Sequence, residues 1–97
     1  MKHILADGML TLYLVGKIDT ETSMKLDPEV NAKIKGYQPQ KVCFDLQGVD
    51  YVASAFLRIC VTTSKQVGDS NFFIVNTQPA IKKIFKIAGL EQVLNIS

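Results

Sequence analysis

The sequence predicts an α/β fold: a single small domain in which a mixed β-sheet is packed with helices. Ninety-seven residues, 47% of them apolar and 21% charged, suffice for one hydrophobic core and are too few for two. Segments with the two-residue period of strands alternate with segments of helical spacing, which calls for parallel strands joined by right-handed crossovers. A turn signal near the N-terminus adds a hairpin. We therefore expect one domain over residues 1–97, with an N-terminal antiparallel hairpin followed by parallel crossovers.

The first two strands are expected at residues 3–5 and 9–15. Ala6-Asp7-Gly8 separates them as a turn, and the second strand places its three leucines on one face. Residues 16–19 close this strand.

A first helix is expected to follow, capped by Asp19 or Thr20. Its candidate buried stripe consists of Met24, Leu26, Val30 and Ile34. Pro28 interrupts the pattern, because proline removes a backbone hydrogen bond inside a helix, so we expect a kink or two short helical pieces. Gly36 is expected to end the element.

The next strand and helix are expected between residues 41 and 68. Residues 41–46 alternate as a strand, and Gln47-Gly48 is expected to turn the chain. Ser54 is a plausible cap for a second helix that Gly68 stops.

The last third of the chain suggests one more strand–helix–strand unit. Residues 71–75 form a continuous apolar run, typical of a central strand buried on both faces. Asn76 or Thr77 is expected to cap a third helix that Gly89 ends, and residues 93–96 suit a short last strand.

Composition excludes several function classes. The net charge of +2 is too small to indicate a nucleic-acid partner. One His and two Cys are too few for a four-ligand Cys/His zinc site, and Cys43 and Cys60 stand in apolar runs where a free thiol packs as a small hydrophobe. No apolar stretch approaches the ~20 residues of a membrane span, and the N-terminal apolar run is too short for a signal peptide. We expect a cytoplasmic protein without a metal.

Common catalytic motifs are also missing from the sequence. It contains neither of the glycine-rich phosphate-binding patterns and no GxSxG motif. The three aspartates that end strands or enter loops, Asp19, Asp45 and Asp50, fit caps and turns better than acid–base chemistry. We expect a protein that is not an enzyme and that needs no cofactor.

The segment from Tyr51 to Leu57 is the most informative one for function. Ser54 stands at the predicted start of a helix, where it could be a simple cap or a phosphorylation switch, since a phosphate there would face the positive helix end. Phe56 follows closely and could be either a core residue or an exposed apolar anchor for a partner.

At this point the sequence resembles the STAS domain family, in particular the small stand-alone bacterial anti-sigma factor antagonists. Three stretches carry the resemblance over nearly the whole chain. Gly16-Lys17-Ile18-Asp19 is similar to the family's G-x-[IL]-D segment. Residues 44–49 with 54–58 are similar to D-L-S-G-V … S-[SA]-G-L. Two residues depart from the family pattern: Ala53 stands where the family has Asp or Ser, and Phe56 stands where it has Gly. Residues 76–90 are similar to the closing S-P-x-V … F … G-L segment.

The resemblance implies partner switching without enzymatic activity. The unmodified antagonist would bind an anti-sigma factor of the ATP-binding serine-kinase type, phosphorylation at the position of Ser54 would end the complex, and a phosphatase would reset it. The implied partner-facing residues are Asp19, Thr20, Thr22, Tyr51, Ala53, Ser54, Ala55, Phe56 and Arg58. The alternative is an unswitched STAS subunit of a larger lipid-transport or stressosome-like assembly.

Overall fold

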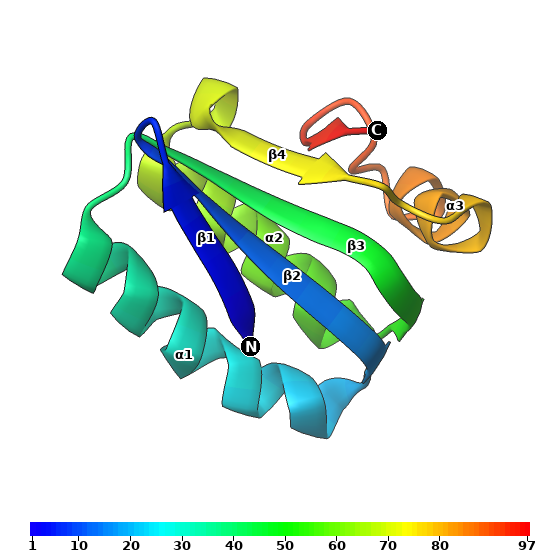
Figure 1. Ribbon diagram of the computed structural model, residues 1–97. Helices are drawn as coiled ribbons and strands as arrows, with labels where there is room; N and C mark the ends of the chain where they lie inside the picture. The colour runs from blue at the N-terminus through cyan, green and yellow to red at the C-terminus, as the bar shows by residue number, and fades with distance from the viewer.

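The computed structural model describes residues 1–97 and contains strands and helices in the predicted order (Figure 1). The strands are β1 (Lys2–Ala6), β2 (Met9–Ile18), β3 (Lys41–Val52), β4 (Phe72–Val75) and β5 (Asn95–Ile96). The helices are α1 (Thr20–Tyr37), α2 (Ser54–Val67) and α3 (Pro79–Ile87), with a short 3-10 turn at Asp69–Asn71. No helix is long and apolar enough to cross a membrane.

One five-stranded mixed sheet organises the molecule, as predicted. Its strand order follows the chain, β1-β2-β3-β4-β5, with β1 antiparallel to β2 and every later pair parallel. Each parallel pair is joined by a helix, so α1 and α2 cross over in succession and pack against each other (Figure 1). The carboxyl ends of β2 and β3 therefore lie beside the starts of α1 and α2.

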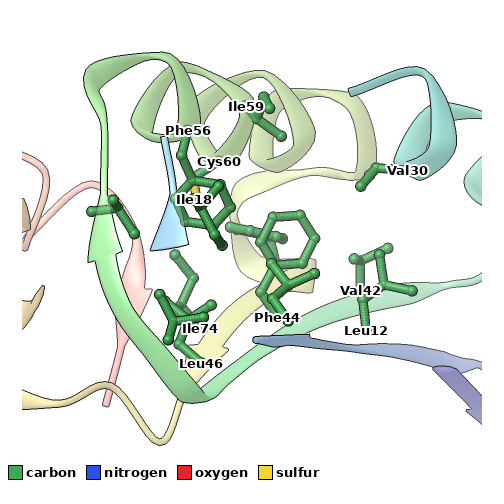
Figure 2. Packing of buried hydrophobic residues seen from close by; sticks show 14 of the residues in the cluster. Leu12, Ile18, Val30, Val42, Phe44, Leu46, Phe56, Ile59, Cys60 and Ile74 are labelled. Carbon is green, nitrogen blue, oxygen red and sulfur yellow. The ribbon is translucent and has the colours of Figure 1, made fainter. Parts of the chain in front are cut away.

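The hydrophobic core lies between the sheet and the helices. Alternate residues of the central strands point into it, and α2 contributes Phe56 and Cys60 from above (Figure 2). The Phe44 ring packs edge-on against Phe72, with ring centroids 4.9 Å apart. Both thiols are free and buried as predicted, and burial raises the pKa of Cys43 and, more strongly, of Cys60.

Helix α1 corrects the expectation of a break at Pro28. It runs as one element past Pro28 and ends at Tyr37, beyond Gly36, with Gln38 in the left-handed conformation. Pro28 has no N–H to donate, so the carbonyl of Met24, four residues earlier, has no partner within the helix. Both Pro28 and Met24 are exposed. Water can therefore satisfy that carbonyl, and the helix continues. Met24 is 72% exposed and so does not belong to the buried stripe.

Strand β3 corrects a second expectation. Gln47-Gly48 does not turn the chain, because the strand continues to Val52. Instead, the β2–β3 register shifts: Tyr13 lies opposite Asp45, whereas Val15 lies opposite Gly48. Such a bulge bends a strand without ending it. A Cβ on Gly48 would lie 2.8 Å from Val15 Cγ1, so an alanine at this position would require the Val15 side chain or its strand to shift.

The C-terminal unit is close to expectation, with shifted boundaries. Strand β4 alternates between buried and half-buried residues and is not buried on both faces. Gln78, rather than Asn76 or Thr77, precedes α3, and Pro79 occupies its first turn. The Asn76 side chain instead donates to Asp45 Oδ2 at 2.9 Å, which fastens the β4–α3 junction to β3.

Candidate functional site

Two junctions meet at the carboxyl end of the sheet: β2 with α1, and β3 with α2 (Figure 1). The Ala53 amide donates a hydrogen bond to the Ile18 carbonyl at 2.9 Å. This bond holds Ala53, which precedes Ser54, against Ile18, which precedes Asp19. The predicted partner-facing segments, far apart in sequence, are therefore adjacent in space.

Asp19 is the N-cap of α1, as predicted. Its Oδ1 accepts a hydrogen bond from the Thr22 amide at 2.8 Å, and its carbonyl accepts one from Ser23 Oγ at 2.7 Å. The bond from Thr22 lowers the pKa of the Asp19 carboxyl below its ordinary value, because it favours the charged form. Asp19, Thr20 and Thr22 are all exposed, so this turn presents a fixed negative charge to solvent.

Ser54 is exposed and is the first residue of α2. It is not the cap that the sequence suggested, because Ala53 occupies the N-cap position and offers no side-chain acceptor. The Ser54 hydroxyl has no hydrogen-bond partner within the protein that would commit it to a capping role. The hydroxyl is therefore free at the positive end of a 14-residue helix.

Phe56 decides one of the open alternatives and corrects one predicted site residue. Its side chain is 0% exposed and packs with its ring centroid 6.1 Å from that of Phe44 (Figure 2). It lies on the core side of α2, two residues beyond Ser54, because helical geometry turns it away from the exposed face. Phe56 is a core residue, and its side chain is not exposed for contact with a partner.

A shallow hollow of about 510 Å³ lies at the ends of β2 and β3. Its lining consists of Lys17, Asp19, Asp50 and Tyr51. Tyr51 is 46% exposed, which agrees with a contact role for its ring. Lys17 and Asp50 were not among the predicted partner-facing residues; their positions at the ends of paired parallel strands are the signal that could have indicated them.

A second hollow, which we call the helix groove, runs between α1 and α2. It has a volume of about 150 Å³ and is lined by Ser23, Met24, Asp27, Ala55, Arg58, Ile59 and Thr62. It includes two predicted residues, the half-buried Ala55 and the exposed Arg58. The α1 side was missed because Met24 was assigned to a buried stripe.

No group of three or more His, Cys, Asp or Glu side chains is placed so that it could hold a metal ion. The charged groups of the two hollows are instead three carboxylates, one lysine and one arginine, and the free hydroxyl of Ser54 stands at the start of α2. This set is suited to recognition by contact and to modification of the hydroxyl.

The sequence model of the STAS domain family matches residues 4–97. This chain belongs to the STAS domain family. BtrV of Bordetella bronchiseptica, provisionally assigned as an anti-sigma factor antagonist, is 28% identical to this STAS chain over 94 residues, which are 94% of this chain and 79% of BtrV.

Solved structures show the same fold. An anti-sigma factor antagonist from Mycobacterium paratuberculosis has a TM-score of 0.86 at 24% identity, covering 98% of this chain and 81% of that one. The phosphorylated form of SpoIIAA, a Bacillus cell fate determinant, has a TM-score of 0.72 at 11% identity, covering 99% of this chain and 89% of that one. The mixed sheet and its order of helices are therefore those of the STAS fold.

Proposed function

We propose that this STAS domain is an anti-sigma factor antagonist that acts in the cytoplasm by protein–protein contact. The unmodified form binds an anti-sigma factor of the ATP-binding serine-kinase type and so releases a sigma factor. Phosphorylation of Ser54 ends this complex, and a phosphatase removes the phosphate. The names of BtrV and of the Mycobacterium structure support the first part, and the phosphorylated SpoIIAA structure supports the second.

The observation that carries the proposal is the exposed, uncommitted hydroxyl of Ser54 at the start of α2. The bond from Ala53 to Ile18 holds the start of α2 beside the Asp19 turn, and Asp19 and Tyr51 line the same hollow. A partner that covers these residues buries the hydroxyl in its interface. A phosphate at this position would bring about −1.5 to −2 charges into that interface, at a large desolvation cost.

The chemistry of the switch requires only the hydroxyl from this chain. Ser54 Oγ forms a bond to the γ-phosphorus of ATP, the bond from that phosphorus to the β–γ bridging oxygen breaks, and ADP leaves. A base of the kinase takes the hydroxyl proton. Because Phe56 is buried, it does not stand between Ser54 and a kinase cleft, although the family has glycine at this position.

A second candidate is a constitutive STAS subunit of a larger assembly, for example a lipid-transport or stressosome-like one. One observation favours it: Ala53 and Ala55 flank Ser54, so no neighbouring hydroxyl or carboxylate assists recognition by a kinase. In this case Ser54 would be an ordinary surface residue, and binding would not respond to charge at its position.

The two candidates are separated by capture of partners from the native cells with three baits: the wild-type chain, Ser54→Ala and Ser54→Asp. Mass spectrometry identifies the proteins retained by each bait. We expect a small ATP-binding kinase with the first two baits and a strong loss with Ser54→Asp. A loss of ~3 kcal/mol in binding is about 150-fold in affinity.

Lys65→Asp is the matched control, because Lys65 is exposed on α2 but lies near its far end. It adds the same aspartate to the same helix and should retain the kinase. Equal retention of one set of proteins by wild type and Ser54→Asp would contradict switching and favour the constitutive subunit.

A further inference from the structure

The helix groove adjoins Ser54 and extends the surface that a partner can contact. Its α2 wall contains Ala55 and Arg58, which follow Ser54 by one and four residues. Its α1 wall contains Met24, which is 72% exposed although it is apolar. The groove thus begins at the residue after Ser54 and offers apolar contact area at Met24.

Arg58 is an unpaired cation in this groove. It makes no ion pair within 4.0 Å and no hydrogen bond within the protein. Asp27 faces the same groove from α1, but its Oδ1 accepts a hydrogen bond from Asn31 Nδ2 at 3.3 Å. A guanidinium without a partner is available for an anionic group.

Ser54 and Arg58 are four residues apart in α2, and both are exposed. Residues with this spacing are neighbours on one helix face, and an anion that precedes a cation by four residues is the favourable order. Guanidinium also matches phosphate oxygens with two parallel hydrogen bonds. The chain therefore carries an exposed guanidinium one helical turn beyond Ser54.

We propose that Arg58 couples the phosphorylation state of Ser54 to the helix groove. Without phosphate, the guanidinium stays in the groove and is offered to an acidic group of the anti-sigma factor. With phosphate, Arg58 turns toward Ser54, and the groove loses its cation while Asp27 remains as its only charge. The inference rests on the proposed function for the identity of the partner, but the Ser54–Arg58 contact itself does not require a partner.

The contact is tested on the chain alone, with phosphoserine incorporated genetically at position 54. The pKa of the phosphate is measured by ³¹P nuclear magnetic resonance in the wild-type background and in Arg58→Gln. Pairing with Arg58 favours the dianion, so we expect the phosphate pKa to be about 0.4 lower in the wild-type background than in Arg58→Gln. Arg58→Lys should restore part of this lowering.

Lys65→Gln removes the same charge from α2 at a distance and serves as the control. It should leave the phosphate pKa unchanged. A phosphate pKa that is equal in the wild-type background and Arg58→Gln, or that Lys65→Gln changes as much as Arg58→Gln does, would overturn the proposal. Because no kinase or sigma regulator enters the experiment, failure here is distinguishable from failure of the proposed function.

Discussion

The burial of the Phe56 side chain decides between its two predicted roles, an exposed anchor for a partner and a core residue. Its ring is fully buried under α2 and packs near Phe44, whereas the nearby Tyr51 is 46% exposed. Removal of a buried phenylalanine ring leaves a cavity in addition to the loss of apolar burial.

We therefore expect Phe56→Ala to lower the free energy of unfolding by about 3–5 kcal/mol, as measured by urea denaturation. Tyr51→Ala, a control on the exposed side of the same junction, should change it by about 0.5 kcal/mol or less. A loss for Phe56→Ala no larger than that for Tyr51→Ala would contradict the core assignment. If Phe56→Ala does not fold, Phe56→Leu provides the measurable intermediate case, with a smaller loss in the same direction.

The Asp19 carboxyl makes the stability of the fold depend on pH. Its pKa is lowered in the folded state by the hydrogen bond from the Thr22 amide. A carboxyl with a lowered folded-state pKa stabilises the fold above its unfolded pKa of about 3.9, and this contribution is lost as the pH falls through the folded-state value.

Asp19→Ala should accordingly melt at a lower temperature than wild type at neutral pH, and the difference should narrow below about pH 4. The measurement is thermal unfolding by circular dichroism across this range. Asp7→Ala is the control, because Asp7 is exposed in the turn between β1 and β2 and caps no helix. A difference in melting temperature between wild type and Asp19→Ala that stays constant with pH would show that the charge of the Asp19 carboxylate does not cause the difference.

At the scale of elements, the β2–β3 pair depends on close contact between Gly48 and Val15. The two residues are opposite each other just after the register shift, and a Cβ on Gly48 would come within 2.8 Å of Val15 Cγ1. A methyl group at this place therefore forces the Val15 side chain or the strands to adjust.

Gly48→Ala should lower the free energy of unfolding by about 1–3 kcal/mol. Val15 is 74% exposed, so Val15→Ala alone should cost little. Combined with Gly48→Ala, it should recover most of the loss, because it removes the atom that clashes. A double-mutant cycle measures this coupling. Additive effects of the two substitutions would show that the close contact does not determine stability here.

The same pair of strands explains where the sequence-based predictions succeeded and where they did not. Alternation along residues 9–15 and 41–46 predicted the strands correctly, because one face of each is buried. Gln47-Gly48 resembled a turn, but a glycine serves a bulge equally well, and only the facing Val15 decides between these uses. Val15 lies on the neighbouring strand, so the sequence around Gly48 does not reveal this contact.

For the whole molecule, all strands and helices and their order along the chain could be predicted from periodicity, and the crossover rule predicted that the strands after the hairpin are parallel. The order of neighbours within the sheet comes from the structure. The site was predicted in part. Asp19 and Ser54 were found through capping patterns and the STAS resemblance, and the bond between Ala53 and Ile18 brings their junctions together. The helix groove was missed because it depends on the exposed side of α1, which a single helix pattern with Pro28 does not reveal.

We expect the Ser54 hydroxyl to control one interface of this domain. The most direct test is release of the purified kinase-type partner from the immobilised chain on addition of Mg²⁺ and ATP. Wild type and Ser54→Ala are compared, and intact-mass spectrometry counts the phosphates on each chain.

We expect wild type to acquire one phosphate, at Ser54, and to release the partner, whereas Ser54→Ala should acquire none and retain it. Retention of the partner by phosphorylated wild type, or equal release from Ser54→Ala, would show that the Ser54 hydroxyl does not control the interface.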